Sequence, residues 1–222
     1  EDLISALDPE LKERVSSKIR LGNIFKDINH EAQEGDFDLI FMGTHGAKGL
    51  QKLFGSKAMK VVMSSAVPFV ISQEKEPQKE ISKIVLPVDL SHEKIQIVKF
   101  AADLAVRFKA KVHIVSAAQS DEFLINRMRN NITKVKRMLM KEGIDFELNE
   151  VAGKASFQDE LIAMASQLDA DLIALAHHPQ TLIPQLEKFS QALITNSEGI
   201  PVLIVNAKEL IGVKANYSFV GI

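Results

Sequence analysis

The stretch that decides the fold is Asp38-Leu39-Ile40-Phe41-Met42-Gly43-Thr44-His45-Gly46-Ala47-Lys48-Gly49, which continues to Phe54-Gly55-Ser56. It begins with a short apolar run that ends at a glycine, which is typical of a buried parallel strand. The residues after Ser56 have the spacing of a helix. The sequence therefore predicts a strand, a glycine-rich loop and the start of a helix, in that order.

The glycines of this loop favour a site for an anion. Gly43, Gly46 and Gly55 let the backbone approach a ligand closely, and the free N–H groups at the start of a helix attract negative charge. The functional interpretation is a phosphate cradle, and the alternative is a glycine-rich turn without a ligand. Spacing alone leaves both open, because isolated glycine patterns are weak signals.

Three pieces of this region resemble the closing motif of the universal stress protein family: Met42-Gly43-Thr44-His45-Gly46, Gly55-Ser56, and Ala66-Val67-Pro68-Phe69-Val70-Ile71. In the family pattern, Gly-x-x-Gly is followed by Gly-Ser or Gly-Thr. Eight residues separate the two parts here, one fewer than in the family. The resemblance implies that the loop binds the ribose and phosphates of a nucleotide, usually ATP.

The resemblance assigns the nucleotide contacts to residues at the strand end, in the loop and at the helix start: Met42, Gly43, Thr44, Gly46, Gly55, Ser56 and Lys57. His45 lies inside the loop, where its position fits a phosphate contact and a packing role equally well. The implied cofactor is ATP or a related adenine nucleotide.

The chain also contains an internal repeat. Asp36–Ile40 matches Asp169–Ile173, and Pro68–Ile71 matches Pro201–Ile204 at the same offset. Helices and strands alternate along the chain, which predicts an α/β fold with helices on both faces of a parallel sheet. The resemblance implies two flavodoxin-like or Rossmann-like domains of the adenine nucleotide alpha hydrolase-like type, each with a parallel five-stranded sheet.

We expect four parts in the chain: an incomplete first universal stress protein domain at 1–73, a charged linker at 74–82, a second such domain at 83–207, and a C-terminal tail at 208–222. The first domain lacks a counterpart of the strand, helix and strand that open the second. This gap implies that the sequence is a piece of a longer chain or that a partner supplies the missing layer. We also expect Val67–Ile71 and Val202–Val205 to pack together as the last strands of the two copies.

The second copy has lost the cradle. The matched positions hold Ala176, Pro179, Lys188 and Phe189 in place of the glycines and serine, so no nucleotide is expected there. Asp89 resembles the Asp that ends the family's first strand and faces the nucleotide. A lone Asp after a strand is, however, more often a helix-start residue.

The remaining pattern predicts further elements. Helices are expected at 24–32, 57–64, 92–109, 121–142, 157–168 and 182–196, and strands at 16–21, 67–71, 84–88, 112–115, 146–151, 172–176 and 201–205. The basic residues of the helix at 121–142 have no interleaved aromatics, so they are interpreted as a solvated face.

Several functional classes are disfavoured. The net charge of −2 gives no reason to expect a nucleic acid or an anionic membrane as partner. The absence of cysteine excludes disulfides and thiolate chemistry. His177 and His178 are adjacent, and adjacent strand residues face opposite ways, so no metal site is expected. No nucleophile and base stand at a useful spacing, so the protein is not expected to be an enzyme.

We expect a cytoplasmic protein, and the resemblance implies that it is a nucleotide-binding regulatory protein of the stress response. Its expected assembly is a pseudo-dimer of the two domains or a homodimer, with an unidentified protein partner. The alternatives are an interaction or scaffold protein of the same fold without a working nucleotide site, and a slow ATPase.

Overall fold

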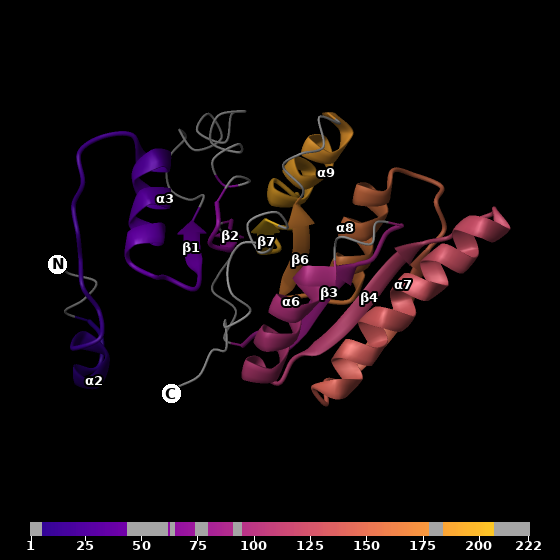
Figure 1. Cartoon of the computed structure of the whole chain (residues 1–222), viewed down its shortest axis with the longest axis horizontal. Helices are drawn as coiled ribbons and strands as arrows, with labels where there is room; N and C mark the ends of the chain where they lie inside the picture. Colours follow the sequence, from indigo (N-terminus) through magenta and orange to yellow (C-terminus); the bar gives the residue numbers. More distant parts are fainter. Residues whose placement is uncertain are drawn as a thin grey trace.

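The computed structural model describes residues 6–43, 62, 65–73, 80–90, 95–177 and 184–206 (Figure 1). One seven-stranded sheet runs through both repeats in the order β1-β2-β7-β6-β3-β4-β5. Its strands are β1 (Ile40–Gly43), β2 (Phe69–Ser72), β3 (Lys83–Pro87), β4 (Lys111–Ala117), β5 (Phe146–Val151), β6 (Leu172–His177) and β7 (Val202–Asn206). The predicted α/β class is confirmed, but the sheet has seven strands where five were expected.

The second repeat has the expected strand order. Its five strands lie in the order β5-β4-β3-β6-β7, which is third, second, first, fourth and fifth along that repeat. This is the flavodoxin-like order, with the first strand in the centre. The first repeat contributes β1 and β2, which correspond to β6 and β7. Among the described strands, β1 pairs only with β2 and forms one edge of the sheet.

The two repeats meet where β2 pairs with β7. This is the one antiparallel pair among the described strands, with Phe69 opposite Ile204 and Ile71 opposite Val202. The expectation that the last strands of the two copies lie side by side is thus confirmed. All four of these side chains are almost completely buried, so each apolar edge covers the other. As a consequence, the strands of the first repeat run opposite to those of the second.

Four of the described helices cover the sheet in the second repeat. They are α6 (Ile95–Phe108), α7 (Glu122–Lys141), α8 (Phe157–Gln167) and α9 (Pro184–Ile194). The buried residues of α6 and α7 pack in one core cluster, and those of α8 and α9 pack in another on the opposite face. Side chains of successive strand residues belong to the two clusters in turn, because strand side chains alternate between the faces of a sheet. Leu86 packs in the cluster with α6 and α7, and its neighbour Val85 packs in the cluster with α8 and α9.

The helix starts follow from local sequence. The Asp121 side chain accepts a hydrogen bond from the backbone N–H of Leu124 at the start of α7. Ser156 caps α8 in the same way by accepting from the N–H of Asp159. These caps satisfy N–H groups that have no partner within the helix. The helices predicted at 121–142 and 157–168 are therefore confirmed with nearly the expected bounds.

The N-terminal part of the chain packs little. In α2 (Pro9–Lys12), Pro occupies the first turn and no residue is buried. The strand predicted at 16–21 is wrong, because the segment pairs with no described strand and leaves Ile19 and Leu21 92% and 98% exposed. In α3 (Ile24–Glu34), Ile28 packs against the cluster formed with α8 and α9. Figure 1 shows α2 and α3 at the β1 side of the sheet.

Candidate functional site

The described part of the candidate loop is its entrance, Met42 and Gly43, at the carboxyl end of β1. Met42 is half-buried against the core cluster on the α8 side. Gly43 lies opposite Ser72 of β2. A Cβ added to Gly43 would meet no atom of the described residues within 4 Å. No described side chain or backbone atom therefore accounts for the glycine, and the described residues leave the space beside it open.

The other loop residues predicted to contact nucleotide lie outside the described residues. These are Thr44, His45, Gly46, Gly55, Ser56 and Lys57. Their assignments remain predictions. Val62, which follows in the chain, is helical and 2% exposed, and it packs against the cluster that also contains Phe69 and Ile71.

Asp89 lies at the other end of the sheet from Gly43. It follows β3, which is parallel to β6 and, through β6, to β7. Because β7 is antiparallel to β2, the carboxyl end of β3 and the carboxyl end of β1 face opposite ends of the sheet. The structure therefore does not bring Asp89 and Gly43 together, and Asp89 belongs to the second repeat.

Asn131 is a buried polar residue beside Asp89 that the sequence analysis did not select. It lies on α7 and is 3% exposed, and its Nδ2 donates a 2.9 Å hydrogen bond to the backbone carbonyl of Asp89. Its Oδ1 is buried without a hydrogen-bond partner among the described residues. The sequence contained a signal for this residue, namely a polar side chain on the apolar face of a helix. Asn131 stands between Met128 and Val135 on that face.

In the second copy, two residues that match the glycine-rich loop of the first copy take part in packing. Phe189, at the position that matches Ser56, stacks on Phe157 of α8 with ring centroids 5.8 Å apart and planes 6° apart. Ala176, which matches Gly43, is 5% exposed within the core. Ala176 is therefore a core side chain and Phe189 packs against the core, while the expectation that the second copy binds no nucleotide stays a prediction. Pro179 lies outside the described residues.

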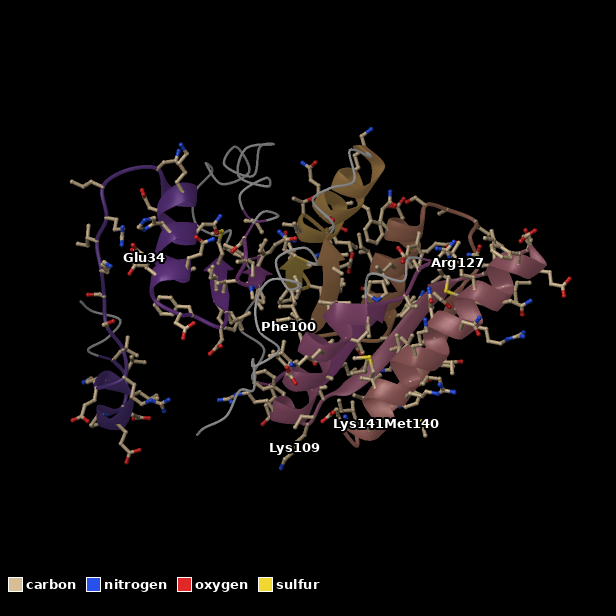
Figure 2. The ribbon with its side chains drawn as sticks, viewed as in Figure 1. Glu34, Phe100, Lys109, Arg127, Met140 and Lys141 are labelled. Carbon is tan, nitrogen blue, oxygen red and sulfur yellow. The ribbon has the colours of Figure 1, made fainter. Side chains whose placement is uncertain are left out.

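The basic side chains of α7 lie along an exposed surface. Figure 2 labels Arg127 near one end of this helix and Lys141 near the other. Arg129, Lys134 and Arg137 are exposed, while the ammonium of Lys136 lies 5.9 Å from the ring centre of Phe146. This placement matches the predicted solvated face, with one lysine that covers an aromatic ring.

The described part of the chain has no candidate for a metal centre or for a membrane-spanning helix. There, His, Asp and Glu side chains form no group of three or more that could hold a metal ion. None of the helices described combines the length and the apolar character that crossing a bilayer requires.

Comparison with family models and solved structures shows which proteins the chain resembles. The family model described as "Universal stress protein family" matches residues 4–73 and 80–206. A universal stress protein from Archaeoglobus fulgidus DSM 4304 is 17% identical, with a TM-score of 0.64 over 92% of this chain and 76% of that chain. A putative universal stress protein from Pseudomonas aeruginosa UCBPP-PA14 is 19% identical, with a TM-score of 0.61 over 92% of this chain and 76% of that chain.

A smaller neighbour is a universal stress protein solved in complex with cAMP. It is 22% identical and covers 58% of this chain and 99% of that chain, with a TM-score of 0.45. No protein of curated function matches the chain in sequence. At these identities the structural neighbours show the fold alone. The family model, which matches most of both repeats, shows that this chain belongs to the universal stress protein family.

Proposed function

We propose that the first repeat binds an adenine nucleotide, ATP or a close relative, in the loop from Gly43 to Ser56. The observation that carries the proposal is the space beside Gly43, where an added Cβ would meet no atom of the described residues within 4 Å. Gly43 ends a parallel strand, and open α/β sheets bind ligands beyond the carboxyl ends of their strands. Membership of the family supports the same assignment.

The loop residues have distinct roles in this proposal. Gly43, Gly46 and Gly55 let the backbone approach the ribose and phosphates, and N–H groups at the following helix start donate to phosphate oxygens. Thr44 and Ser56 add hydroxyl groups, and Lys57 adds positive charge. The bound nucleotide changes the contacts that the protein makes with a partner during a stress response.

The first experiment measures nucleotide retained through purification, followed by calorimetry with ATP on the stripped protein. Gly43→Ala is the sharpest variant, because the structure leaves room for the methyl group and the fold is therefore expected to survive. We expect at least about tenfold weaker ATP binding for Gly43→Ala and for Gly46→Val, since each Cβ enters the space of the phosphates.

The repeat supplies a matched control. Pro179→Val changes the position that corresponds to Gly46 in the second copy, and it is expected to leave ATP affinity unchanged. Equal loss of affinity in Pro179→Val and Gly46→Val would place the nucleotide elsewhere. Unchanged affinity in both glycine variants would remove the site from this loop.

A second candidate is an interaction protein without a working nucleotide site. The observation that favours it is that the first repeat supplies only β1 and β2 to the described sheet. The strand that carries the nucleotide-facing Asp in the family pattern has no counterpart beside them among the described residues, and Asp89 belongs to the second repeat. Purified protein without nucleotide, together with no heat of ATP binding, would support this candidate. Slow hydrolysis is tested by phosphate release over hours in the wild type and in Gly46→Val.

A further inference from the structure

We propose that a cavity at the junction of the two repeats binds a small organic cation, an ammonium or guanidinium group carried on an apolar body. The cavity has a volume of about 340 Å³, within the size range of small-molecule pockets. The first repeat lines it with Phe41, Val70 and Gln73, and the second with residues that precede β6 and β7. Its position follows from the antiparallel β2–β7 pair, which sets the carboxyl end of β2 beside the amino end of β7.

One wall of the cavity is apolar. Phe41, Val70 and Ile81 line it together with Leu172 and Ile200. Phe41 and Val70 are partners in the β1–β2 register, so they lie on the same face of the sheet. Phe41 is 71% exposed, and its aromatic face is a favourable contact for an organic cation.

Many of the hydrogen-bond donors that line the cavity already donate within the protein. Five backbone N–H groups of the turns before β6 and β7 donate within the protein: Asp169 to Ser166, Ala170 to Ala165, Asp171 to Lys83, Gly199 to Asn196, and Ile200 to the Asn196 side chain. Both N–H bonds of the Gln73 amide go to the carbonyls of Ile194 and Asn196. The Ser166 hydroxyl donates to Glu198. These groups have no donor left for a ligand.

The acceptors at the cavity are carboxylates. Asp169, Asp171 and Glu198 line it, and its described lining contains no Lys, Arg or His. In Asp171, Oδ2 accepts three hydrogen bonds, from the N–H and hydroxyl of Ser82 and from the N–H of Lys83. The Lys83 ammonium donates to the carbonyl of Leu168 at 2.8 Å.

The ligand class follows from this balance of donors and acceptors. The carboxylates would repel an anion in the cavity, whereas a cation brings hydrogen-bond donors and the opposite charge. The apolar wall selects a cation with a hydrophobic body over an inorganic ion. The cavity lies at the same end of β1 and β2 as the proposed nucleotide loop, because Ser72, the register partner of Gly43, also lines it.

The test uses the full chain and three small probes of one shape: benzylammonium, benzyl alcohol and benzoate. Nuclear Overhauser contacts from the phenyl protons are expected at the methyl groups of Val70, Ile81 and Leu172, and only benzylammonium should produce them at low millimolar concentration. Added salt should weaken its binding. Contacts confined to other residues, or binding of benzoate as tight as that of benzylammonium, would overturn the proposal.

The repeat again offers a matched pair of variants. Asp169 and Asp36 occupy the same turn in the two copies, with φ of 49° and 52°, and Asn tolerates this left-handed conformation. Asp169→Asn removes a carboxylate at the cavity and should weaken benzylammonium binding about threefold. Asp36→Asn makes the same change away from the cavity and should leave binding unchanged. An equal effect of the two variants would contradict the site.

Discussion

The two repeats place the same strand in two different environments. Leu172 to Ala176 of β6 are all buried, whereas β1 alternates between half-buried and exposed residues. At matched positions, Ala174 is completely buried and Phe41 is 71% exposed. β6 pairs on both sides, with β3 and β7, while β1 pairs only with β2 among the described strands. The neighbours of a strand therefore decide its burial more than its own hydrophobicity does.

The repeats also differ in how they use the former loop positions. The second repeat, which has five strands and four described helices, packs Phe189 against Phe157. The first repeat keeps the glycines and a serine but supplies only two strands to the described sheet. The comparison suggests a division of roles, in which the second repeat provides most of the core and the first provides the candidate ligand loop.

The largest effect expected from this comparison concerns the separated repeats. Residues 1–80 should show no cooperative thermal unfolding, because two paired strands bury too little apolar area to offset a chain-entropy cost of about 1–2 kcal/mol per residue. Residues 80–206 should unfold cooperatively. Calorimetry of both fragments tests this, and a cooperative transition of monomeric 1–80 would show that the first repeat is stable alone.

A matched pair of core variants gives the next largest effect. Leu175 and Met42 occupy corresponding positions, but Leu175 is 1% exposed and Met42 is half-buried. Leu175→Ala should lower the free energy of unfolding by about 2–5 kcal/mol, because it leaves a cavity in the core. Met42→Ala should cost about 1 kcal/mol or less. Urea denaturation gives both values, and equal losses would mean that β1 is as well packed as β6.

Phe189→Ser restores in the second copy the residue that the first copy has. It removes the ring that stacks on Phe157, and we expect a loss of about 2 kcal/mol in the free energy of unfolding. The variant should still not bind ATP, because Pro179 and Lys188 remain in place of the glycines. A urea denaturation experiment measures the loss of stability, and calorimetry with ATP on the folded variant tests nucleotide binding. Nucleotide binding by this variant would show that Phe189 alone closes the second site.

The smallest expected effect is a dependence of stability on pH that a buried histidine of the second repeat provides. His113 of β4 is 4% exposed, and its Nε2 has no hydrogen-bond partner among the described residues. Burial lowers the pKa of His113, Lys111 and Lys83 act in the same direction, and Glu147 and Asp145 oppose them. The unfolded chain therefore binds this proton more readily, and stability should fall as the pH drops below about 6.5 towards the folded pKa.

Urea denaturation at several pH values measures that slope. His113→Gln should remove the part of it that lies just below pH 6.5. Val112→Ala, a buried neighbour on the same strand, should lower stability at every pH and leave the slope as in the wild type. A slope unchanged in His113→Gln would assign the effect to other groups.

The helices and strands of the second repeat could be predicted from the sequence because the signals that mark them are local. Asp121 and Ser156 mark helix starts, and short apolar runs mark strands that are buried on both faces. Sequence reasoning failed at 16–21, where apolar residues such as Ile19 suggested a strand but no described strand pairs with them. For the candidate site it selected Met42 and Gly43, which lie at a strand end, and it missed Asn131, whose significance depends on contact with the distant Asp89.

By itself, the sequence determined the α/β class, the repeat, the family and the loss of the glycine loop in the second copy, because these depend on residue order and spacing. Only the tertiary structure decided that the repeats share one sheet through an antiparallel β2–β7 pair. That pair reverses the strand direction, separates Asp89 from Gly43 and forms the cavity between the repeats. The physical reason is that strand pairing joins residues far apart in the chain, and their relative direction is not encoded in either strand alone.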